Sequence, residues 1–173
     1  MHLTSFSDYT LRTLIYLGLR PNELCTIDEI AAAYTISANH LMKVVHQAAK
    51  AGEVETVRGQ RGGMRLARPP EAINIGTVLR RTEPDLHIAA CFGSDSACCL
   101  QPACVLLVAL GDALAAFMAV LDGMSLAELI RPSLNQPGRW QTRRWGRDRR
   151  ETVYSRDRRP NTVIYGGARH ETT

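Results

Sequence analysis

The sequence lacks the compact motifs by which common enzyme classes are recognised. It contains no phosphate-binding glycine loop, no Gly-x-Ser-x-Gly nucleophile elbow, no HExxH metal-hydrolase motif and no internal repeat. Each missing motif removes one route to catalysis. We therefore expect a protein that binds partners and is not an enzyme.

Residues 1–8 lack the features of a secretory signal, because they are polar and contain no basic region followed by an apolar core. We expect a cytoplasmic protein, in a reducing compartment where disulfides are rare. One long apolar run, residues 102–121, contains Gly111 and Asp112. It is predicted to be a buried helix of a soluble protein and not a membrane span.

Lysine and arginine are missing from residues 82–130, which contain six acidic residues. Residues 40–81 instead contain eight basic and three acidic residues, a net charge of +5. A local positive charge of this size suits contacts with phosphate groups. The charge pattern predicts a nucleic-acid-binding half followed by an acidic half.

Capping signals and apolar spacing predict three helices before Gly52. The first runs from Phe6 to Leu19 with Ser7 as its cap, and the second opens at the capping box Thr26-Ile-Asp-Glu29. The third is capped by Ser37, runs from Ala38 to about Ala51 and turns an apolar face inward: Leu41, Val44, Val45 and Ala48. The last two helices match a helix-turn-helix, whose second helix enters the major groove. Its candidate DNA contacts are Ser37, Asn39, His40 and Lys43.

A hairpin follows the third helix. Val54 to Val57 is predicted to form one strand, Met64 to Leu66 the other, and the Gly- and Arg-rich residues 58–63 the turn. Such a hairpin can act as a wing, because glycines allow close approach to the duplex and arginines pair with phosphates or enter a minor groove. A solvated charged hairpin is the alternative. The candidate DNA contacts are Arg58, Gly59, Arg61, Gly62, Gly63 and Arg65.

The second half is predicted to contain three helices, of which the long middle one mediates dimerisation. Asn74 can cap a short helix from Ile75 to about Thr82, and Pro102 is predicted to start a helix that reaches Leu121 and is apolar nearly all the way round. A small domain cannot bury such a helix alone, so we expect a homodimer, whose two-fold symmetry suits a palindromic operator. A capping box at Ser125 should open a last helix that ends before Pro132.

Four cysteines lie close together on one Gly/Ser/Asp-containing segment: Cys91, Cys98, Cys99 and Cys104. Thiolates on a loop can converge on a soft metal centre. The spacing lacks the CxxC pairs that are usual for zinc, so an iron-sulfur cluster is favoured, with a zinc site or no metal as alternatives. His40 and His46 are expected to face DNA or solvent, and Cys25 to pack as a small hydrophobe.

Four segments together resemble the nitric-oxide-sensitive branch of the Rrf-type winged-helix transcription regulators: residues 1–9, residues 58–67, residues 75–79, and Cys98 followed by Pro-Ala-Cys104. The resemblance covers residues 1 to about 130. It implies a dimeric repressor whose iron-sulfur cluster, [2Fe-2S] or [4Fe-4S], is destroyed by nitric oxide. By motif position, the resemblance assigns the cluster ligands Cys91, Cys98 and Cys104, with Asp8 completing the site from the partner subunit. Cys99 and the long Arg-rich tail depart from the family pattern.

The predicted fold class is mainly α with a small β-hairpin wing. Residues 1–83 should form a winged helix-turn-helix DNA-binding domain, residues 84–130 a cluster-binding loop with a long dimerisation helix, and residues 131–173 an Arg-rich disordered tail. A regulator of the same family that senses cluster supply or thiol oxidation is the alternative function.

Overall fold

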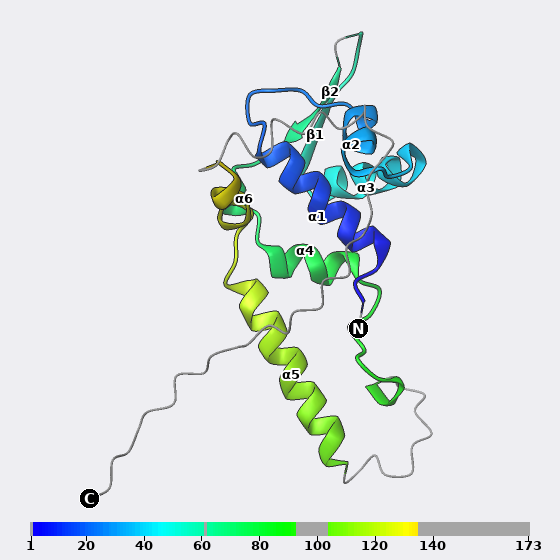
Figure 1. The fold of residues 1–173 in the computed structure, drawn as a ribbon, viewed down its shortest axis with the longest axis vertical. Helices are drawn as coiled ribbons and strands as arrows, with labels where there is room; N and C mark the ends of the chain where they lie inside the picture. The colour runs from blue at the N-terminus through cyan, green and yellow to red at the C-terminus, as the bar shows by residue number, and fades with distance from the viewer. Residues whose placement is uncertain (1, 61, 93–103, 135–173) are drawn as a thin grey trace, which may run out of the picture.

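The computed structural model describes residues 2–60, 62–92 and 104–134 (Figure 1). It is mainly helical with one antiparallel hairpin, as the sequence predicts. The elements are, in order, α1 (Ser5–Gly18), α2 (Ile27–Tyr34), α3 (Ala38–Lys50), β1 (Val54–Val57), β2 (Gly63–Leu66), the 3-10 turn η1 (Pro70–Ala72), α4 (Ile75–Thr82), the 3-10 turn η2 (Ala90–Phe92), α5 (Val105–Asp122) and α6 (Leu126–Leu134).

Helix α1 lies at the centre of the core and begins earlier than predicted. Thr4 is its N-cap and accepts a hydrogen bond from the Ser7 N–H at 3.2 Å. The prediction that Ser7 caps the helix is therefore wrong. Ser7 is fully buried, and its hydroxyl donates to Thr82 Oγ1 at 2.8 Å, which fastens α1 to α4.

The helix-turn-helix forms as the capping signals predict. The Thr26 N–H donates to Glu29 Oε2 at 2.6 Å and the Glu29 N–H donates to Thr26 Oγ1 at 3.2 Å, which completes the capping box of α2. Thr35 then turns the chain toward α3 with a left-handed φ of 56°. The predicted inward face of α3 is buried in full: Leu41, Val44, Val45 and Ala48.

The wing is a two-stranded sheet in which Val54 pairs with Leu66 and Val57 with Gly63. A backbone bridge at its base adds the segment before α2, because Cys25 and Met64 exchange hydrogen bonds of 2.9 and 2.8 Å. Cys25 is only 3% exposed, which confirms that it packs as a small hydrophobe. The wing is thus anchored to the helix-turn-helix.

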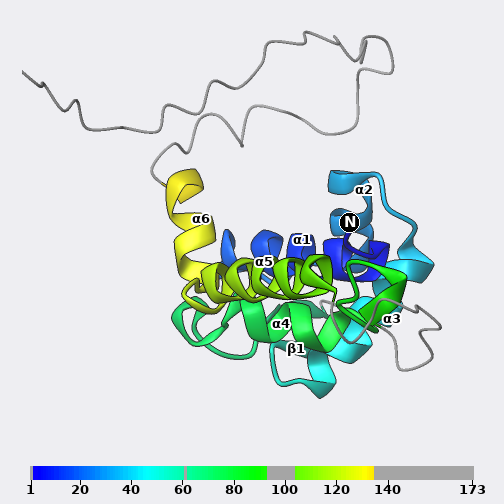
Figure 2. The ribbon, with the colours of Figure 1, turned by 90° about the horizontal axis from the view of Figure 1, so that it is seen from below.

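Helix α5 contacts α4 and then extends away from the rest of the described chain in Figure 1; in Figure 2, seen from below, it crosses in front of α1 and α4. It begins at Val105 because Cys104 is extended (φ −80°, ψ 102°), and Pro102, its predicted start, lies outside the described residues. The prediction of a buried helix is wrong for the single chain. Only Met118 is buried on α5, whereas Val105 is 81% and Val108 64% exposed.

Helix α6 returns to the core, where Leu126 and Ile130 are buried against α1. The Ser125 N–H donates to Glu128 Oε2 at 2.7 Å, which confirms the predicted capping box. The prediction that this helix ends before Pro132 is wrong, because α6 continues to Leu134. A proline removes one backbone donor, which the last turns of a helix can accommodate when packing holds the turns before it.

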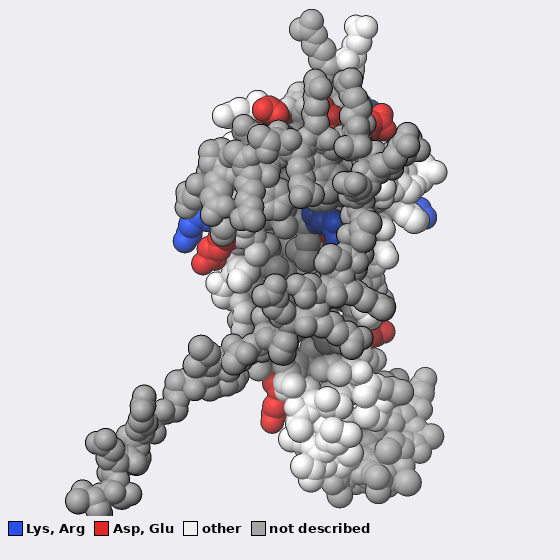
Figure 3. Space-filling view, viewed as in Figure 1, with Lys and Arg blue, Asp and Glu red and all other residues white. Residues whose placement is uncertain are grey.

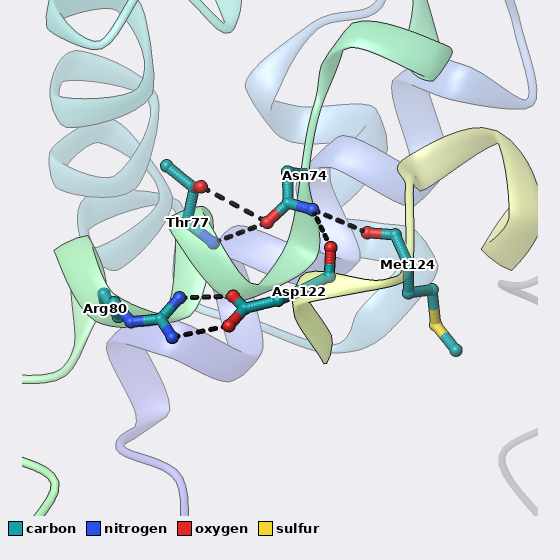
Figure 4. A network of polar contacts seen from close by, with 5 residues as sticks. All are labelled: Asn74, Thr77, Arg80, Asp122 and Met124. Atoms are coloured by element: carbon teal, nitrogen blue, oxygen red, sulfur yellow. Dashed lines mark hydrogen bonds and ion pairs between the residues drawn. The ribbon is translucent and has the colours of Figure 1, made fainter. Parts of the chain in front are cut away.

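A polar joint connects α4 to the end of α5 (Figure 4). Arg80 and Asp122 pair through both oxygens of the carboxylate, one of them 2.7 Å from Nη2. Asn74 caps α4 through the Thr77 N–H at 2.9 Å and donates from its amide to the Asp122 carbonyl at 2.6 Å. A Cβ on Gly76 would overlap the Asp122 carboxylate, so glycine permits this close approach.

Candidate DNA interface and metal centre

The predicted contact face of α3 is open to solvent. Ser37 is the N-cap residue but makes no side-chain cap hydrogen bond, and Asn39, His40 and Lys43 are exposed. Burial of the opposite face fixes these side chains outward, since residues three and four apart share one side of a helix. The face offers the hydroxyl, amide and cationic groups that can contact base edges and phosphates.

The wing presents the second predicted set of residues. Arg58 and Gly59 are exposed, and Gly59 has a φ of 121° that side chains rarely adopt. A Cβ on Gly62 would collide with the Val57 carbonyl oxygen, and one on Gly63 would lie 2.9 Å from the Cys25 carbonyl oxygen. Both positions therefore require glycine for the hairpin itself.

The wing arginines differ in their surroundings. Arg65 Nε lies 3.1 Å from Glu55 Oε2 on the neighbouring strand, so part of its charge is already paired. Arg58 is exposed at the end of β1, while Arg61 lies outside the described residues. Within the described wing, Arg58 is the better placed residue for an additional phosphate.

The described part of the chain does not bring the predicted metal ligands together. Cys91 in η2 and Cys104 before α5 are both partly exposed, and Cys98 and Cys99 lie outside the described residues. Asp8 lies on α1 and pairs with Arg12, whose Nε is 2.8 Å from Asp8 Oδ2. Residues 2–60, 62–92 and 104–134 contain no group of three or more His, Cys, Asp or Glu side chains that could hold a metal.

Cys25 differs from Cys91 and Cys104 in its surroundings. Burial raises the pKa of the Cys25 thiol, and the nearby Arg20 only partly opposes this rise. A thiol that resists deprotonation is a poor metal ligand, because metals bind the thiolate. Partly exposed Cys91 and Cys104 are the better candidates among the described cysteines.

Two features of the structure are not evident from the sequence. Glu53 is 1% exposed, and its Oε2 lies 2.5 Å from Arg81 Nη2 on α4. Burial raises the pKa of Glu53, against the opposing effect of Arg81 and Arg68. The Arg80–Asp122 joint was also missed. In the sequence, charged residues at these positions cannot be distinguished from ordinary surface residues. Their partners become apparent only from the packing of the helices.

The end of the molecule that α5 forms is apolar. On the face drawn in Figure 3, the described atoms there are white apart from acidic atoms at one edge. By length and composition alone, α5 would suffice to cross a membrane. Only 6% of this span is buried inside the single chain. This apolar surface is continuous with the segment that carries Cys104.

A helix-turn-helix with a wing, an exposed polar recognition face and an apolar helical arm defines a winged-helix transcription regulator. The chain belongs to the Rrf2 family, described as iron-dependent transcriptional regulators, whose model matches residues 3–132. The predicted family and fold class are confirmed, and the family consists of regulators and not of enzymes.

Relatives support this assignment. The chain is 48% identical over 133 residues to the HTH-type transcriptional regulator NsrR of Bacillus subtilis, covering 76% of this chain and 91% of that protein. It is 48% identical over 132 residues to NsrR of Bacillus licheniformis, with coverages of 75% and 92%.

Solved structures share the fold. T. potens IscR superposes with a TM-score of 0.62 at 22% identity, covering 77% of this chain and 88% of that one. CymR of B. subtilis, the global cysteine regulator, gives 0.61 at 23% identity, with coverages of 76% and 98%.

Proposed function

We propose that this chain is a cytoplasmic, homodimeric DNA-binding repressor that uses an iron-sulfur cluster to sense nitric oxide. The observation that carries the proposal is the division of the chain into two connected parts. One part holds an exposed recognition helix and wing, and the other holds the partly exposed Cys91 in η2 and Cys104 at the start of the exposed apolar helix α5.

The DNA-binding part suits one half-site. The N-terminal residues of α3 would contact base edges in the major groove, while Arg58 and the glycines of the wing would lie against the backbone or minor groove. The predicted wing residue Arg61 would contribute in the same way. The excess of +5 in residues 40–81 would supply the salt-dependent part of the affinity.

A second chain is the partner proposed for α5. Val105, Leu106, Val108 and Val120 are all more than 60% exposed, which a monomer in water would not favour. Asp112 in the middle of the helix disfavours a membrane span. Pairing two copies of α5 would bury both apolar surfaces and place two recognition helices on a palindromic operator.

The donor set fits an iron-sulfur cluster and fits zinc less well. Cys91, Cys98 and Cys104 would supply three thiolates, and a carboxylate such as Asp8 would be a weaker fourth ligand. Asp8 does not join Cys91 and Cys104 in the described part of one chain. We therefore propose that Asp8 of one chain approaches the thiolates of the partner chain. Its carboxylate would leave the ion pair with Arg12 and bind the metal instead. A bound cluster supplies a reactive iron centre that nitric oxide can attack.

The proposed coupling runs from the ligands to the recognition helices. Asp8 belongs to α1, which is fastened to α4 through Ser7 and Thr82, and α4 is joined to α5 through Arg80 and Asp122. A ligand shared between Asp8 of one chain and the thiolates of the other would fix the two DNA-binding parts relative to each other. Losing that link would change the spacing of the half-site contacts.

Anaerobic purification of the full chain tests this function. We expect visible absorption with bound iron and sulfide, tight binding to a duplex selected from a randomised library, and release by nitric oxide. Cys91→Ala, Cys98→Ala and Cys104→Ala should each lose the iron, and Cys25→Ala and Cys99→Ala should keep it. Asp8→Ala should bind the cluster weakly and the duplex poorly.

Several outcomes would contradict the proposal. Iron kept in Cys98→Ala and lost in Cys99→Ala would show that Cys99 is the ligand. Iron-free protein that binds the selected duplex as tightly as the iron-loaded form, with no effect of nitric oxide, would remove the sensor role. Protein without visible absorption that responds to thiol oxidation would favour the alternative regulator.

A further inference from the structure

A buried carboxylate fixes an arginine beside the recognition helix. Glu53 is the only charged residue among the buried polar residues that the structure describes. Its side chain is 2% exposed, with Oε2 2.5 Å from Arg81 Nη2 and Oε1 3.9 Å from Arg68 Nη2. Both cations keep part of their surface in solvent, 27% for Arg81 and 39% for Arg68. The carboxylate is thus inside, and the guanidinium groups reach outward.

The backbone of Glu53 is held as firmly as its side chain. Its N–H donates to the Ala48 carbonyl at the end of α3 at 3.0 Å, and its carbonyl accepts from the Ala67 N–H after β2 at 2.9 Å. The carboxylate is therefore fixed relative to α3 and the wing. Through Arg81, the same residue also fixes the last turn of α4.

Arg81 borders a hollow beside α3. The hollow, of about 480 Å³, is lined by Phe6 of α1, by Lys43, His46 and Gln47 of α3, and by Arg81 of α4. Lys43, His46 and Gln47 are spaced three and four residues apart and are exposed on one face of the recognition helix. None of the residues that line the hollow is acidic, so it presents two cations to an anion, Lys43 and the Arg81 that Glu53 holds in place, with further donors beside them.

A buried ion pair is weak evidence for stability, since apolar residues of similar size often serve as well. Holding an arginine in one position has a different benefit. A guanidinium has five donors in a planar fork, and fixing it beforehand lowers the entropy lost when it binds a phosphate. The pair with Glu53 occupies one nitrogen of Arg81 in the structure.

We propose that Arg81 and Lys43 together bind one backbone phosphate of the DNA in the hollow between α3 and α4, with Glu53 as the residue that positions Arg81. This rests on the proposed function, because it assumes that α3 enters the major groove. It adds a contact from α4, outside the helix-turn-helix and the wing. The partner chemistry is a phosphodiester, so the contact is independent of base sequence.

The test compares neighbouring arginines on α4 in the full chain. Arg81→Ala should weaken binding roughly tenfold, both to a duplex selected by the wild-type protein and to an unrelated duplex, and lower the salt slope by about one. Arg80→Ala is the matched control on the unrelated duplex, because it removes the same charge from the neighbouring residue, which does not line the hollow. It should leave the salt slope unchanged.

Glu53→Gln separates positioning from folding. Gln keeps the shape but not the charge, so we expect a melting temperature equal to or above that of the wild type, with weaker binding to both duplexes. Arg81→Ala alone leaves a buried carboxylate without its main partner, which destabilises the fold. If it does not fold, the double variant Glu53→Gln with Arg81→Ala is compared with Glu53→Gln alone, and should show the lower salt slope.

Equal affinity and salt slope in wild type and Arg81→Ala, or an equal drop of the salt slope on the unrelated duplex in Arg80→Ala, would overturn the inference. Replacing single phosphates of the selected duplex with methylphosphonates locates the contact: one position should weaken the wild type and not Arg81→Ala. A wild-type protein that binds no duplex would instead refute the proposed function. Loss of binding in Lys43→Ala with none in Arg81→Ala would likewise overturn the inference, because Lys43 would then bind the phosphate without Arg81.

Discussion

The DNA-binding part and the α5 arm differ in how much of their structure one chain can complete. In the first, Leu14, Ile30 and Leu41 are fully buried, the helices carry caps, and α6 returns to close the core. In the second, an apolar helix has one buried residue, Met118, and the thiol segment precedes it. The DNA-binding part is therefore complete within a single chain, whereas the arm leaves an apolar surface that a single chain does not cover.

The largest effect is expected where the arm meets its proposed partner. Val108→Asp places a charge on a surface that is 64% exposed in one chain and buried in the proposed dimer. We expect a monomer by sedimentation velocity and at least a hundredfold loss of operator affinity, because only one half-site can then be held. The melting temperature of the DNA-binding part should not change.

Val108→Leu is the control for this position, because it preserves an apolar surface. It should stay dimeric and keep its affinity. If Val108→Asp remains a dimer, the chains associate elsewhere. A lower melting temperature in Val108→Asp would mean that the arm contributes to the fold of the single chain, and would weaken the contrast between the two parts.

Sequence reasoning predicted the DNA-binding part better than the arm, for a physical reason. Capping boxes such as Thr26–Glu29 and apolar spacing such as that of α3 are local, so neighbouring residues decide them. At the start of α1 the sequence offers both Thr4 and Ser7 as caps; Thr4 is the cap, and the Ser7 hydroxyl instead bonds Thr82, 75 residues away. The burial of α5 in the proposed dimer would depend on a second chain, which no local pattern contains.

The candidate site shows the same division. The exposed positions of Asn39, His40 and Lys43 follow from helix periodicity, and these residues lie where the spacing predicts. The ion pair of Glu53 with Arg81 joins residues 28 positions apart, and the pair of Arg80 with Asp122 joins residues 42 apart. Such contacts depend on how helices pack, so sequence reasoning could not find them.

The second largest effect is expected at the polar joint between α4 and α5. Gly76→Ala would put a Cβ into the Asp122 carboxylate and 3.0 Å from the Asp122 backbone nitrogen, so α5 must shift or the Arg80 contact must break. We expect a loss of about 1 to 3 kcal/mol in the free energy of unfolding, measured with urea. Gly111→Ala is the control, because a Cβ there meets no atom within 4 Å.

Ala at position 111 should be neutral or stabilise the helix by up to about 1 kcal/mol. A Gly76→Ala variant as stable as the wild type would show that the joint adapts easily and transmits little between arm and DNA-binding part. Weaker operator binding by Gly76→Ala, with unchanged binding to an unrelated duplex, would show that the joint sets the spacing of the two half-sites.

The DNA-binding part itself should separate into two kinds of contact. Arg58→Ala should weaken binding to all duplexes and lower the salt slope by about one, whereas Asn39→Ala should cost roughly 1 to 3 kcal/mol at particular base pairs only. Arg65→Ala should have a smaller effect than Arg58→Ala, because Glu55 already pairs with it. Unchanged affinity and salt slope in both wing variants would remove the wing from the interface.

The smallest effect concerns the pH dependence of the core of the DNA-binding part. Burial raises the pKa of Glu53, although Arg81 and Arg68 favour its charged form, so the folded chain holds this proton more tightly than the unfolded chain. Its contribution to stability is therefore largest below the usual glutamate pKa of 4.5 and is lost as the pH rises through the folded value.

The measurement compares the wild type with Glu53→Gln, which does not titrate. Relative to this variant, the free energy of unfolding of the wild type in urea should rise by on the order of 1 kcal/mol between pH 7 and pH 4.5. Glu55→Gln, at a half-exposed position, serves as control and should differ from the wild type by no more than about 0.5 kcal/mol. A wild-type advantage that instead grows with rising pH would mean that the attraction of Arg81 and Arg68 exceeds the cost of burial.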